Sequence, residues 1–345
     1  MPDNYTAKKL CSQPKPIMPS LPSDIGAKRA SFIFTNGTKW VNGTNIKYMF
    51  IEGPEPQWQV VRQAFQQWKD LGIGLTFTET TNIEEAMVRI GFDYTLGSWS
   101  YVGRDILGAS KPDRTMNFGW DLTADPYGKT TALHEIGHTI GFQHEHQSPF
   151  SGIVWNTDAV YTAFSGSPNF WDKTKIDDNI INKLAANDLT GSKWDSTSIM
   201  EYEFGPGLVQ EPVGFKTGIF PPGTLSDPDI QGVKSFYPEI AVSSIIKLNV
   251  LKSAAITARS GKQANFSFTP DSTRKFTFQT IGEMDTVMVI SEKGDNENHY
   301  LQGDDDSGHD RNTKIVLPLV KGREYLINVR VVFTPDANGG AIVVV

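Results

Sequence analysis

Residues 134–146 read His-Glu-Ile-Gly-His-Thr-Ile-Gly-Phe-Gln-His-Glu-His and carry four of the chain's 6 histidines. On an α-helix, positions i and i+4 share one face, so His134 and His138 can present two imidazoles to one metal ion. Gly141 can end the helix and turn the chain sharply, because glycine adopts a positive φ without steric cost. The turn lets His144 swing back as a third ligand. The segment therefore predicts a helix over residues 130–141 that leads into a metal site.

Three imidazoles with one open position are the ligand set of a catalytic zinc ion, whereas closed four-ligand sites are structural. Zinc lowers the pKa of its bound water, and Glu135 can take a proton from that water and pass it to a leaving amine. The other interpretation is a surface helix with incidental histidines. The positions of Glu135, Gly141 and His144 favour one catalytic Zn²⁺ held by three histidines. We expect His146 beside the site or at the surface.

The segment resembles the extended zinc motif of the metzincins, His-Glu-x-x-His-x-x-Gly-x-x-His, and is similar to the astacin branch of that clan. Residues 198–202, Ser-Ile-Met-Glu-Tyr, resemble the astacin Met-turn. The resemblance implies that Met200 lies below the zinc and that Tyr202 is a labile zinc ligand that moves to stabilise the transition state. Glu201 stands where the family has a histidine, and a single cysteine rules out the usual astacin disulfides. The likeness covers about residues 30–239.

The same resemblance implies an α+β metzincin-type protease domain with a twisted sheet and an active-site helix. It implies an extended polypeptide substrate that is cut internally. It further implies that the strand near residues 115–119 is the sheet edge that pairs with the bound peptide. Glu145 is expected to pair with a positive group.

Cys11 lies in an N-terminal arm, residues 1–28, which is rich in proline, serine and lysine and shows no periodicity. A thiolate is a strong zinc ligand, so Cys11 can block the open position and keep a protease latent. The alternative is a thiol with no role.

Local patterns predict the remaining organisation. Two Asn-Gly turns within residues 32–50 favour a strand–turn–strand unit. Apolar residues at helical spacing predict a helix from Pro56 to residue 71, and another helix is expected near 176–186. Ser226 with an acid three positions later indicates a helix start. We place domain boundaries at 1–28 for the arm, 29–239 for the protease domain and 240–345 for an antiparallel β-sandwich, whose alternating runs are typical of that architecture.

Asp304, Asp305 and Asp306 stand on a turn between predicted strands of the C-terminal domain. Clustered carboxylates suit Ca²⁺, which prefers oxygen ligands. They suit a solvated loop equally well.

Composition limits the partners and the location. The net charge of −7 and pI near 5.4 argue against binding to nucleic acid. The mean hydropathy is −0.32, and no run of about 18 apolar residues predicts a membrane span. The first thirty residues show no apolar signal region, so the sequence favours the cytoplasm, whereas the family analogy favours an extracellular location.

These observations predict a zinc-dependent endopeptidase that hydrolyses internal peptide bonds of proteins. Two alternatives remain open at this point. One is a catalytically inactive, zinc-containing binding protein that uses the β-sandwich, and the other is a zinc hydrolase that acts on a substrate other than a peptide.

Overall fold

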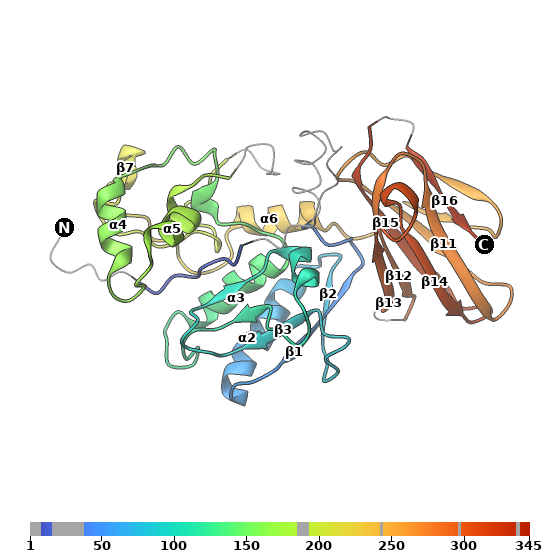
Figure 1. Cartoon of the computed structure of the whole chain (residues 1–345), viewed down its shortest axis with the longest axis horizontal. Coiled ribbons are helices and arrows are strands. Elements are labelled where there is room, and N and C mark those ends of the chain that lie inside the picture. The colour runs from blue at the N-terminus through green and yellow to red at the C-terminus, as the bar shows by residue number, and fades with distance from the viewer. Residues whose placement is uncertain (1–7, 16–37, 185–192, 242–243, 296–297, 336–338) are drawn as a thin grey trace. The chain divides into compact units, whose positions relative to one another are not determined.

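The computed structural model describes residues 8–15, 38–184, 193–241, 244–295, 298–335 and 339–345. The chain divides into two compact units (Figure 1). Unit 1 comprises Met1–Ser20, Lys47–Leu71 and Phe77–Ser235, and unit 2 comprises Leu21–Ile46, Gly72–Thr76 and Phe236–Val345. The last segment of unit 2 therefore begins close to the predicted boundary at residue 240, while two earlier segments also group with that unit.

A five-stranded sheet is built from the first part of the described chain. Its strands are β1 (Asn45–Phe50), β2 (Thr76–Glu79), β3 (Val88–Gly91), β4 (Trp99–Ser100) and β5 (Met116–Asn117), in the order β2-β1-β3-β5-β4. Strand β3 is parallel to both β1 and β5, and β4 is antiparallel to β5.

The prediction that residues 115–119 form the sheet edge is wrong. Strand β5 is an inner strand, because β4 pairs with its outer side through Trp99 opposite Asn117 and Ser100 opposite Met116. The edge of the sheet is therefore β4, which comes earlier in the sequence.

Two helices pack together beside this sheet in Figure 1, α2 (Glu55–Lys69) and α3 (Gly128–Thr139). Helix α2 buries Val61, Phe65 and Trp68, which follow the predicted spacing. The indole nitrogen of Trp68 donates to the carbonyl oxygen of Leu133 at 3.1 Å. Since Leu133 precedes the first metal-ligand candidate, α2 fixes the position of the helix that carries the histidines.

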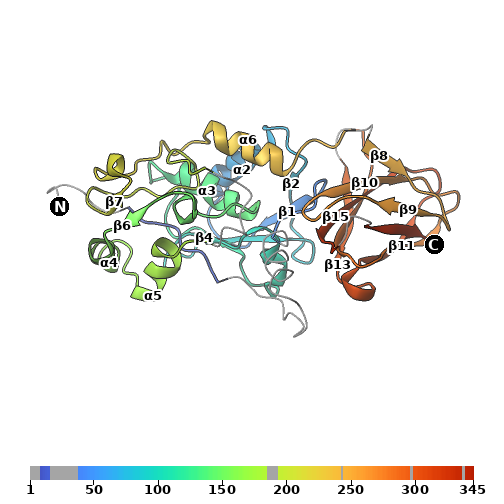
Figure 2. The same cartoon turned by 90° about the horizontal axis from the view of Figure 1, so that it is seen from above.

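The chain after α3 forms short elements around a second core. Those that supply residues to this core include the 3-10 turn η5 (Val213–Phe215), the strands β6 (Val154–Trp155) and β7 (Val209–Glu211), and the helices α4 (Thr157–Ser165) and α5 (Lys173–Ile176). The chain after α3 also forms the 3-10 turn η2 (Glu145–Gln147) and the helix α6 (Asp227–Phe236), and the 3-10 turn η1 (Gly103–Gly108) lies before α3. Figure 2 shows α4 and α5 next to β6. This second core includes Phe164, Phe204 and Tyr202.

The helix predicted near 176–186 differs from the one observed. Helix α5 ends at Ile176 and continues as the π-helix η3 (Asp177–Ile181), while residues 185 and 186 lie outside the described chain. Helix α6 begins as predicted, because the Ser226 hydroxyl accepts from the Asp229 N–H at 3.0 Å and the Asp229 carboxylate accepts from the Ser226 N–H at 2.9 Å. This is a reciprocal capping box.

Unit 2 contains two sheets that share one apolar core. The first sheet has the order β13-β12-β15-β10-β8 and the second β14-β11-β16-β9. Their bounds are β8 (Ile245–Lys247), β9 (Ser253–Ile256), β10 (Gln263–Phe268), β11 (Arg274–Ile281), β12 (Asp285–Glu292), β13 (His299–Asp305), β14 (Lys314–Leu319), β15 (Tyr325–Phe333) and β16 (Gly340–Val344), with the turn η7 (His309–Arg311).

Side chains such as Phe266 and Ile327 from the first sheet and Phe276 and Ile342 from the second meet in that core. This is the layered arrangement expected of a β-sandwich. The strands are antiparallel to their neighbours with one exception, since β8 runs parallel to β10. Of the strand–turn–strand unit predicted over residues 32–50, β1 is present and residues 32–37 lie outside the described chain.

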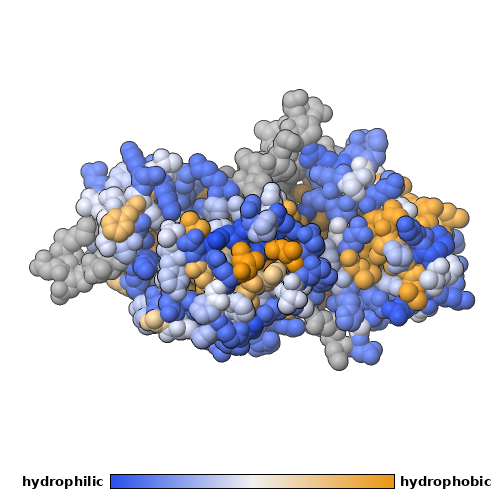
Figure 3. All heavy atoms as spheres, turned by 60° about the horizontal axis from the view of Figure 1, so that its bottom comes forward, coloured by the Kyte–Doolittle hydropathy of each residue, from blue (hydrophilic) through white to orange (hydrophobic). Residues whose placement is uncertain are grey.

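The face drawn in Figure 3 is covered largely by hydrophilic residues, with smaller apolar patches between them. Among the described residues, no helix has the length and apolar character needed to cross a bilayer.

Candidate metal centre

The end of α3 sets the path of the chain into the metal centre. Gly141 has φ 101°, its N–H donates to the His138 carbonyl at 2.8 Å, and the Phe142 N–H donates to the Gly137 carbonyl at 3.0 Å. This pair of bonds is a Schellman motif, which needs a residue with positive φ at the glycine position. The Phe142 ring stacks against Trp68 with centroids 6.0 Å apart. The chain therefore reverses at Gly141, as the sequence predicted.

The reversal brings the three histidines together. Nε2 of His138 and Nε2 of His144 lie 3.1 Å apart, and Nε2 of His134 is buried without a hydrogen-bond partner among the described residues. Ligand atoms of these three histidines and of Cys11 all lie within 4.8 Å of one another. A buried imidazole nitrogen without a hydrogen-bond partner destabilises the folded protein unless it binds a metal. The donor atoms of this site therefore fit a zinc ion.

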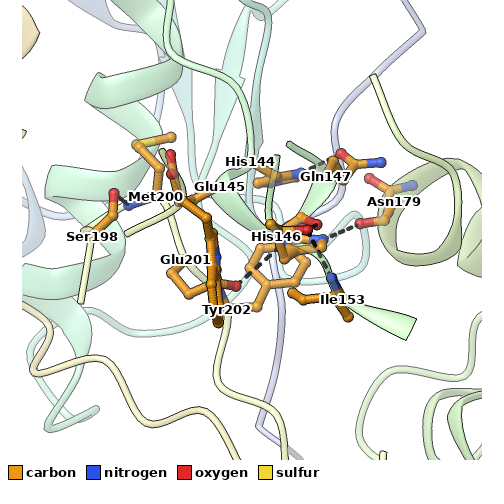
Figure 4. Close-up of polar contacts among 12 residues, drawn as sticks. His144, Glu145, His146, Gln147, Ile153, Asn179, Ser198, Met200, Glu201 and Tyr202 are labelled. Carbon is orange, nitrogen blue, oxygen red and sulfur yellow. Dashed lines mark hydrogen bonds and ion pairs between the residues drawn. The ribbon is translucent and has the colours of Figure 1, made fainter. Parts of the chain in front are cut away.

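Each imidazole is oriented through its other nitrogen. Nδ1 of His134 faces the Ile199 carbonyl at 2.8 Å, and Nδ1 of His138 faces the Phe142 carbonyl at 2.8 Å. Nδ1 of His144 faces Oε1 of Gln147 at 3.2 Å, a contact drawn in Figure 4. A proton on each Nδ1 donates to these oxygens and leaves each Nε2 lone pair free for a metal.

Burial keeps these imidazoles neutral. It lowers the pKa of His134 to about 4, and it lowers the pKa of His138 and of His144 well below the ordinary value, with neighbouring histidines adding to the effect. A neutral imidazole is the form that binds a metal. No local pattern predicted that Ile199 would orient His134, because these residues are 65 positions apart, whereas Gln147 lies only three positions after His144.

Glu135 lies in the same buried site. Neither carboxylate oxygen has a hydrogen-bond partner of normal geometry among the described residues. Burial raises the pKa of this carboxyl well above its usual range, and the nearby Cys11 thiol lowers it to a smaller extent. The carboxylate is therefore free to interact with a water molecule or a substrate.

The turn that carries Met200 lies under the zinc helix. A Cβ added to Gly137 would lie 2.3 Å from Sδ of Met200, so the helix and the methionine are in close contact. The Ser198 hydroxyl donates to Oδ1 of Asp229 at 2.6 Å, and the Ile199 N–H donates to Oδ2 at 2.8 Å. Asp229 in α6 thus clamps the turn, a role that its capping position in the sequence did not reveal.

Tyr202 lies against the histidines, with its ring centroid 4.4 Å from that of His144 and 5.9 Å from that of His134. Its hydroxyl donates to the Cys11 carbonyl at 2.6 Å. Burial, followed by the charge of Cys11, raises the pKa of Tyr202 well above its usual value, so the hydroxyl stays protonated and can donate.

His146 is buried beside the cluster and does not join the ligand group. Its Nε2 lies 2.9 Å from the Asn179 carbonyl, and its Nδ1 lies 3.4 Å from Oε1 of Glu201 (Figure 4). Glu201, which stands where the family has a histidine, also accepts from the Trp194 indole at 2.7 Å and from the Tyr202 N–H at 2.9 Å.

The expected positive partner of Glu145 is not found among the described residues. Its carboxylate accepts from the Asp195 N–H at 2.9 Å. Burial raises the pKa of Glu145 to about 7, and the charges of Glu201, Asp229 and Asp195 add to this rise. The surroundings are acidic, so a backbone donor takes the place of a cation.

The described part of the arm, residues 8–15, lies in the site. Sγ of Cys11 is 3.5 Å from Nε2 of His138 and 3.5 Å from Nε2 of His144. The Ser12 N–H donates to the Ser98 carbonyl at 3.0 Å, next to the edge strand β4. Burial raises the pKa of the Cys11 thiol well above its usual value, and the charge of Glu135 adds to this.

In unit 2, the three aspartates that lie close together are not the three that the sequence predicted. Carboxylate oxygens of Asp285, Asp305 and Asp306 lie within 4.8 Å of one another. The Asp304 carboxylate instead accepts from the Lys314 N–H at 2.8 Å. The geometry therefore groups Asp305 and Asp306 with Asp285 and not with Asp304.

Three converging imidazoles, a buried glutamate on the same helix and a methionine turn beneath them define the metzincin class of metalloproteases. Residues 32–206, half of the chain, match the peptidase family described as Astacin. The chain belongs to the astacin family, a family of metalloendopeptidases whose catalytic metal is zinc.

Individual relatives agree with this assignment. Serralysin of Photorhabdus luminescens is 32% identical over 103 residues, which are 26% of this chain and 20% of that protein. Serralysin G of Dickeya chrysanthemi is 27% identical over 146 residues, which are 37% of this chain and 26% of that protein. The chain thus spans only a fifth to a quarter of these relatives. The structure of myroilysin is similar with 30% identity and a TM-score of 0.55, covering 60% of this chain and 98% of that one.

Proposed function

We propose that the protein is a zinc-dependent endopeptidase that cuts internal peptide bonds of proteins, with Glu135 as general base and then general acid. The observation that carries the proposal is the convergence of three imidazole nitrogens, each oriented through an oxygen acceptor, beside a buried carboxylate without a hydrogen-bond partner of normal geometry among the described residues. His134, His138 and His144 would hold the ion. A bound zinc ion supplies a Lewis acid that activates water and polarises a carbonyl group.

Three residues of the chain would then transfer the proton, stabilise the transition state and support the metal-binding helix. Glu135 takes the proton of the attacking water at a carboxylate oxygen and passes it to the leaving amine. The Tyr202 hydroxyl, which already donates to a main-chain carbonyl in the cleft, donates to the oxygen that becomes negative in the transition state. Met200 supports the helix from below through its contact at Gly137.

The experiment combines metal analysis with casein digestion. The purified chain carrying Cys11→Ala, in which the thiol cannot close the site, is expected to contain one zinc per chain and to cleave casein, and a chelator should abolish the cleavage. Glu135→Gln should keep the zinc and lose turnover by at least about 100-fold, while the exposed control Glu211→Gln should behave as wild type. Activity that survives in Glu135→Gln, or cleavage insensitive to chelator, would overturn the mechanism. A zinc-loaded protein that cleaves no protein even with Cys11→Ala would favour a binding function.

The position of Cys11 in the site supports the proposal that the N-terminal arm keeps the protease inactive. A thiolate from Cys11 would complete four ligands around the ion, which is a closed site without a position for substrate. Cys11→Ala, or treatment with a mercurial, should therefore raise the initial rate of casein cleavage. Ser12→Ala is the control, because its described contact uses only the main-chain N–H. Equal rates for wild type, Cys11→Ala and mercurial-treated protein would remove the latency role.

Calcium in unit 2 and an extracellular location stay predictions. Ca²⁺ at Asp285, Asp305 and Asp306 should raise the melting temperature of the protein, and Asp305→Asn should cancel that rise. Fractionation of the producing cells and their medium checks the location.

A further inference from the structure

A pocket lies beside the candidate catalytic residues within unit 1. It spans about 640 Å³, a volume that includes open solvent, and the walls on the protease side include Trp120, Tyr127, Thr130, Glu135, Tyr202 and Glu203. Residues 8–11 of the arm line the remaining side. Because Glu135 and Tyr202 border it, any side chain that enters this pocket belongs to a residue close to the reacting bond.

The side chain of Lys8 enters this pocket and finds two specific partners. Its Nζ forms an ion pair with Oε2 of Glu203 and lies 3.4 Å from the centroid of the Tyr127 ring. The Lys8 side chain is 30% exposed to solvent and the Glu203 side chain 16% exposed. A cation over a tyrosine ring and against a shielded carboxylate gains from both contacts, since partial burial reduces screening by water.

The walls on the protease side carry carboxyl groups. They contribute Glu135, Glu201 and Glu203, and among the described residues that line the pocket the lysines are those of the arm. Glu135 belongs to the metal centre, and Glu201 is occupied by Trp194 and by the Tyr202 N–H. Of these three carboxyl groups, Glu203 is therefore the one that is available to pair with a positively charged side chain of a bound peptide.

The main chain of the arm is held by contacts that any peptide can make. The Asn169 amide brackets Leu10, accepting from its N–H at 2.9 Å and donating to the Lys8 carbonyl at 2.8 Å. The Tyr202 hydroxyl donates to the Cys11 carbonyl. Such contacts do not depend on side chains, so selection between substrates falls to the pocket.

We propose that Glu203 and Tyr127 form a subsite that selects a lysine or arginine side chain of the substrate close to the cleaved bond, and that Lys8 fills this subsite while the arm lies in the cleft. The inference rests on the proposed endopeptidase function. The cation of a substrate replaces the ammonium group of Lys8, whereas an acidic side chain would face Glu203 and be rejected.

The first test measures cleavage preference. The zinc-loaded full chain with Lys8→Ala and Cys11→Ala, so that the arm does not compete, digests a peptide library whose products are sequenced by mass spectrometry. We expect lysine and arginine to be enriched at one fixed position within about three residues of the cut. For two peptides that differ by lysine or methionine at that position, kcat/KM should favour lysine about 10-fold, or about 1.4 kcal/mol.

Adding Glu203→Gln should remove this preference, while the exposed control Glu211→Gln should keep it. Cleavage without a basic preference, or a preference that persists in Glu203→Gln, overturns the subsite and leaves the endopeptidase function intact.

The second test does not need turnover. In the full chain carrying Glu135→Gln, hydrogen exchange is measured at the amides of Leu10, Ser12 and Gln13, which are donors in the arm contacts. Glu203→Gln should speed this exchange about 5-fold or more, and the charge swap Lys8→Glu with Glu203→Lys should restore the slower rate. Unchanged exchange in Glu203→Gln overturns the subsite. If exchange depends on Glu203 while the zinc-loaded Cys11→Ala chain with Glu135 intact cleaves no protein, the Lys8 site stands and the proposed function is overturned.

Discussion

Replacing Asp229 with alanine tests how α6 supports the metal centre. The Asp229 carboxylate accepts from the Ser198 hydroxyl at 2.6 Å, from the Ile199 N–H at 2.8 Å and from the Ser226 N–H at 2.9 Å. The Ile199 carbonyl in turn faces Nδ1 of His134 at 2.8 Å. Asp229→Ala therefore removes the clamp on the turn and weakens the orientation of one metal ligand.

The magnitude follows from the number and type of the lost bonds. A hydrogen bond to a charged group contributes about 1.5–3 kcal/mol, and a buried donor left without an acceptor costs about 1–3 kcal/mol. Because neighbouring bonds do not add fully, we expect Asp229→Ala to lower the free energy of unfolding of unit 1 by about 3–5 kcal/mol. Asp229→Asn should cost about 1–2 kcal/mol, since one amide oxygen can still accept from both N–H groups.

Urea unfolding followed by tryptophan fluorescence suits this test. Of the 8 tryptophans, Trp40 alone belongs to unit 2, so the signal reports mainly on unit 1. With a slope of about 3 kcal/mol per molar urea, the Asp229→Ala midpoint should fall by about 1 M or more. Asp227→Ala is the matched control, because this carboxylate is exposed on the same helix turn. Equal midpoints for Asp229→Ala and Asp227→Ala would refute the clamp.

Three further changes have measurable outcomes. Gly137→Ala should lower the free energy of unfolding by about 2–3 kcal/mol, because its Cβ would meet Sδ of Met200 at 2.3 Å. Gln147→Ala should raise the dissociation constant for zinc about 10-fold in a chelator competition, because Nδ1 of His144 loses its acceptor. Asp105→Asn should stabilise the protein at pH 8 by about 2 kcal/mol, because burial raises the pKa of Asp105 to about 6 and its charged form is costly.

Each of these three substitutions has a control variant or a pH condition that distinguishes its specific effect from an unspecific change in stability or zinc affinity. Gly232→Ala in α6 should be tolerated, since its Cβ would meet nothing nearer than Phe142 at 3.9 Å, and equal losses at the two glycines would contradict the steric argument. Gln143→Ala should leave zinc affinity unchanged. The Asp105→Asn gain should vanish as the pH falls from 6 towards 4, where the native carboxyl is already protonated. A gain that is independent of pH would rule out ionisation as its cause.

Several local features followed directly from short-range patterns. The spacing of Val61, Phe65 and Trp68 predicted α2, and Ser226 with Asp229 predicted the start of α6. The reversal at Gly141 was also predictable, because a Schellman turn depends on one residue with positive φ. Alternating runs such as those around Phe266 likewise predicted the strands of unit 2.

Other predictions failed where the outcome depended on distant segments. The pattern of residues 115–119 identifies a strand, but its place inside the sheet depends on β4, which pairs with its outer side. Glu145 was expected to have a cationic partner, and its neighbours proved to be acidic residues far along the chain.

The sequence by itself determined the donor set of the metal centre, because the histidines and Glu135 lie within a dozen residues and one helix and one turn fix their spacing. Only the tertiary structure decided what surrounds them: the Ile199 oxygen that orients His134, the Asp229 clamp, and the meeting of Lys8 with Glu203 and Tyr127. The physical reason is that contacts within one turn of helix are set by backbone geometry, whereas contacts between segments up to about two hundred residues apart exist only after the whole core has packed.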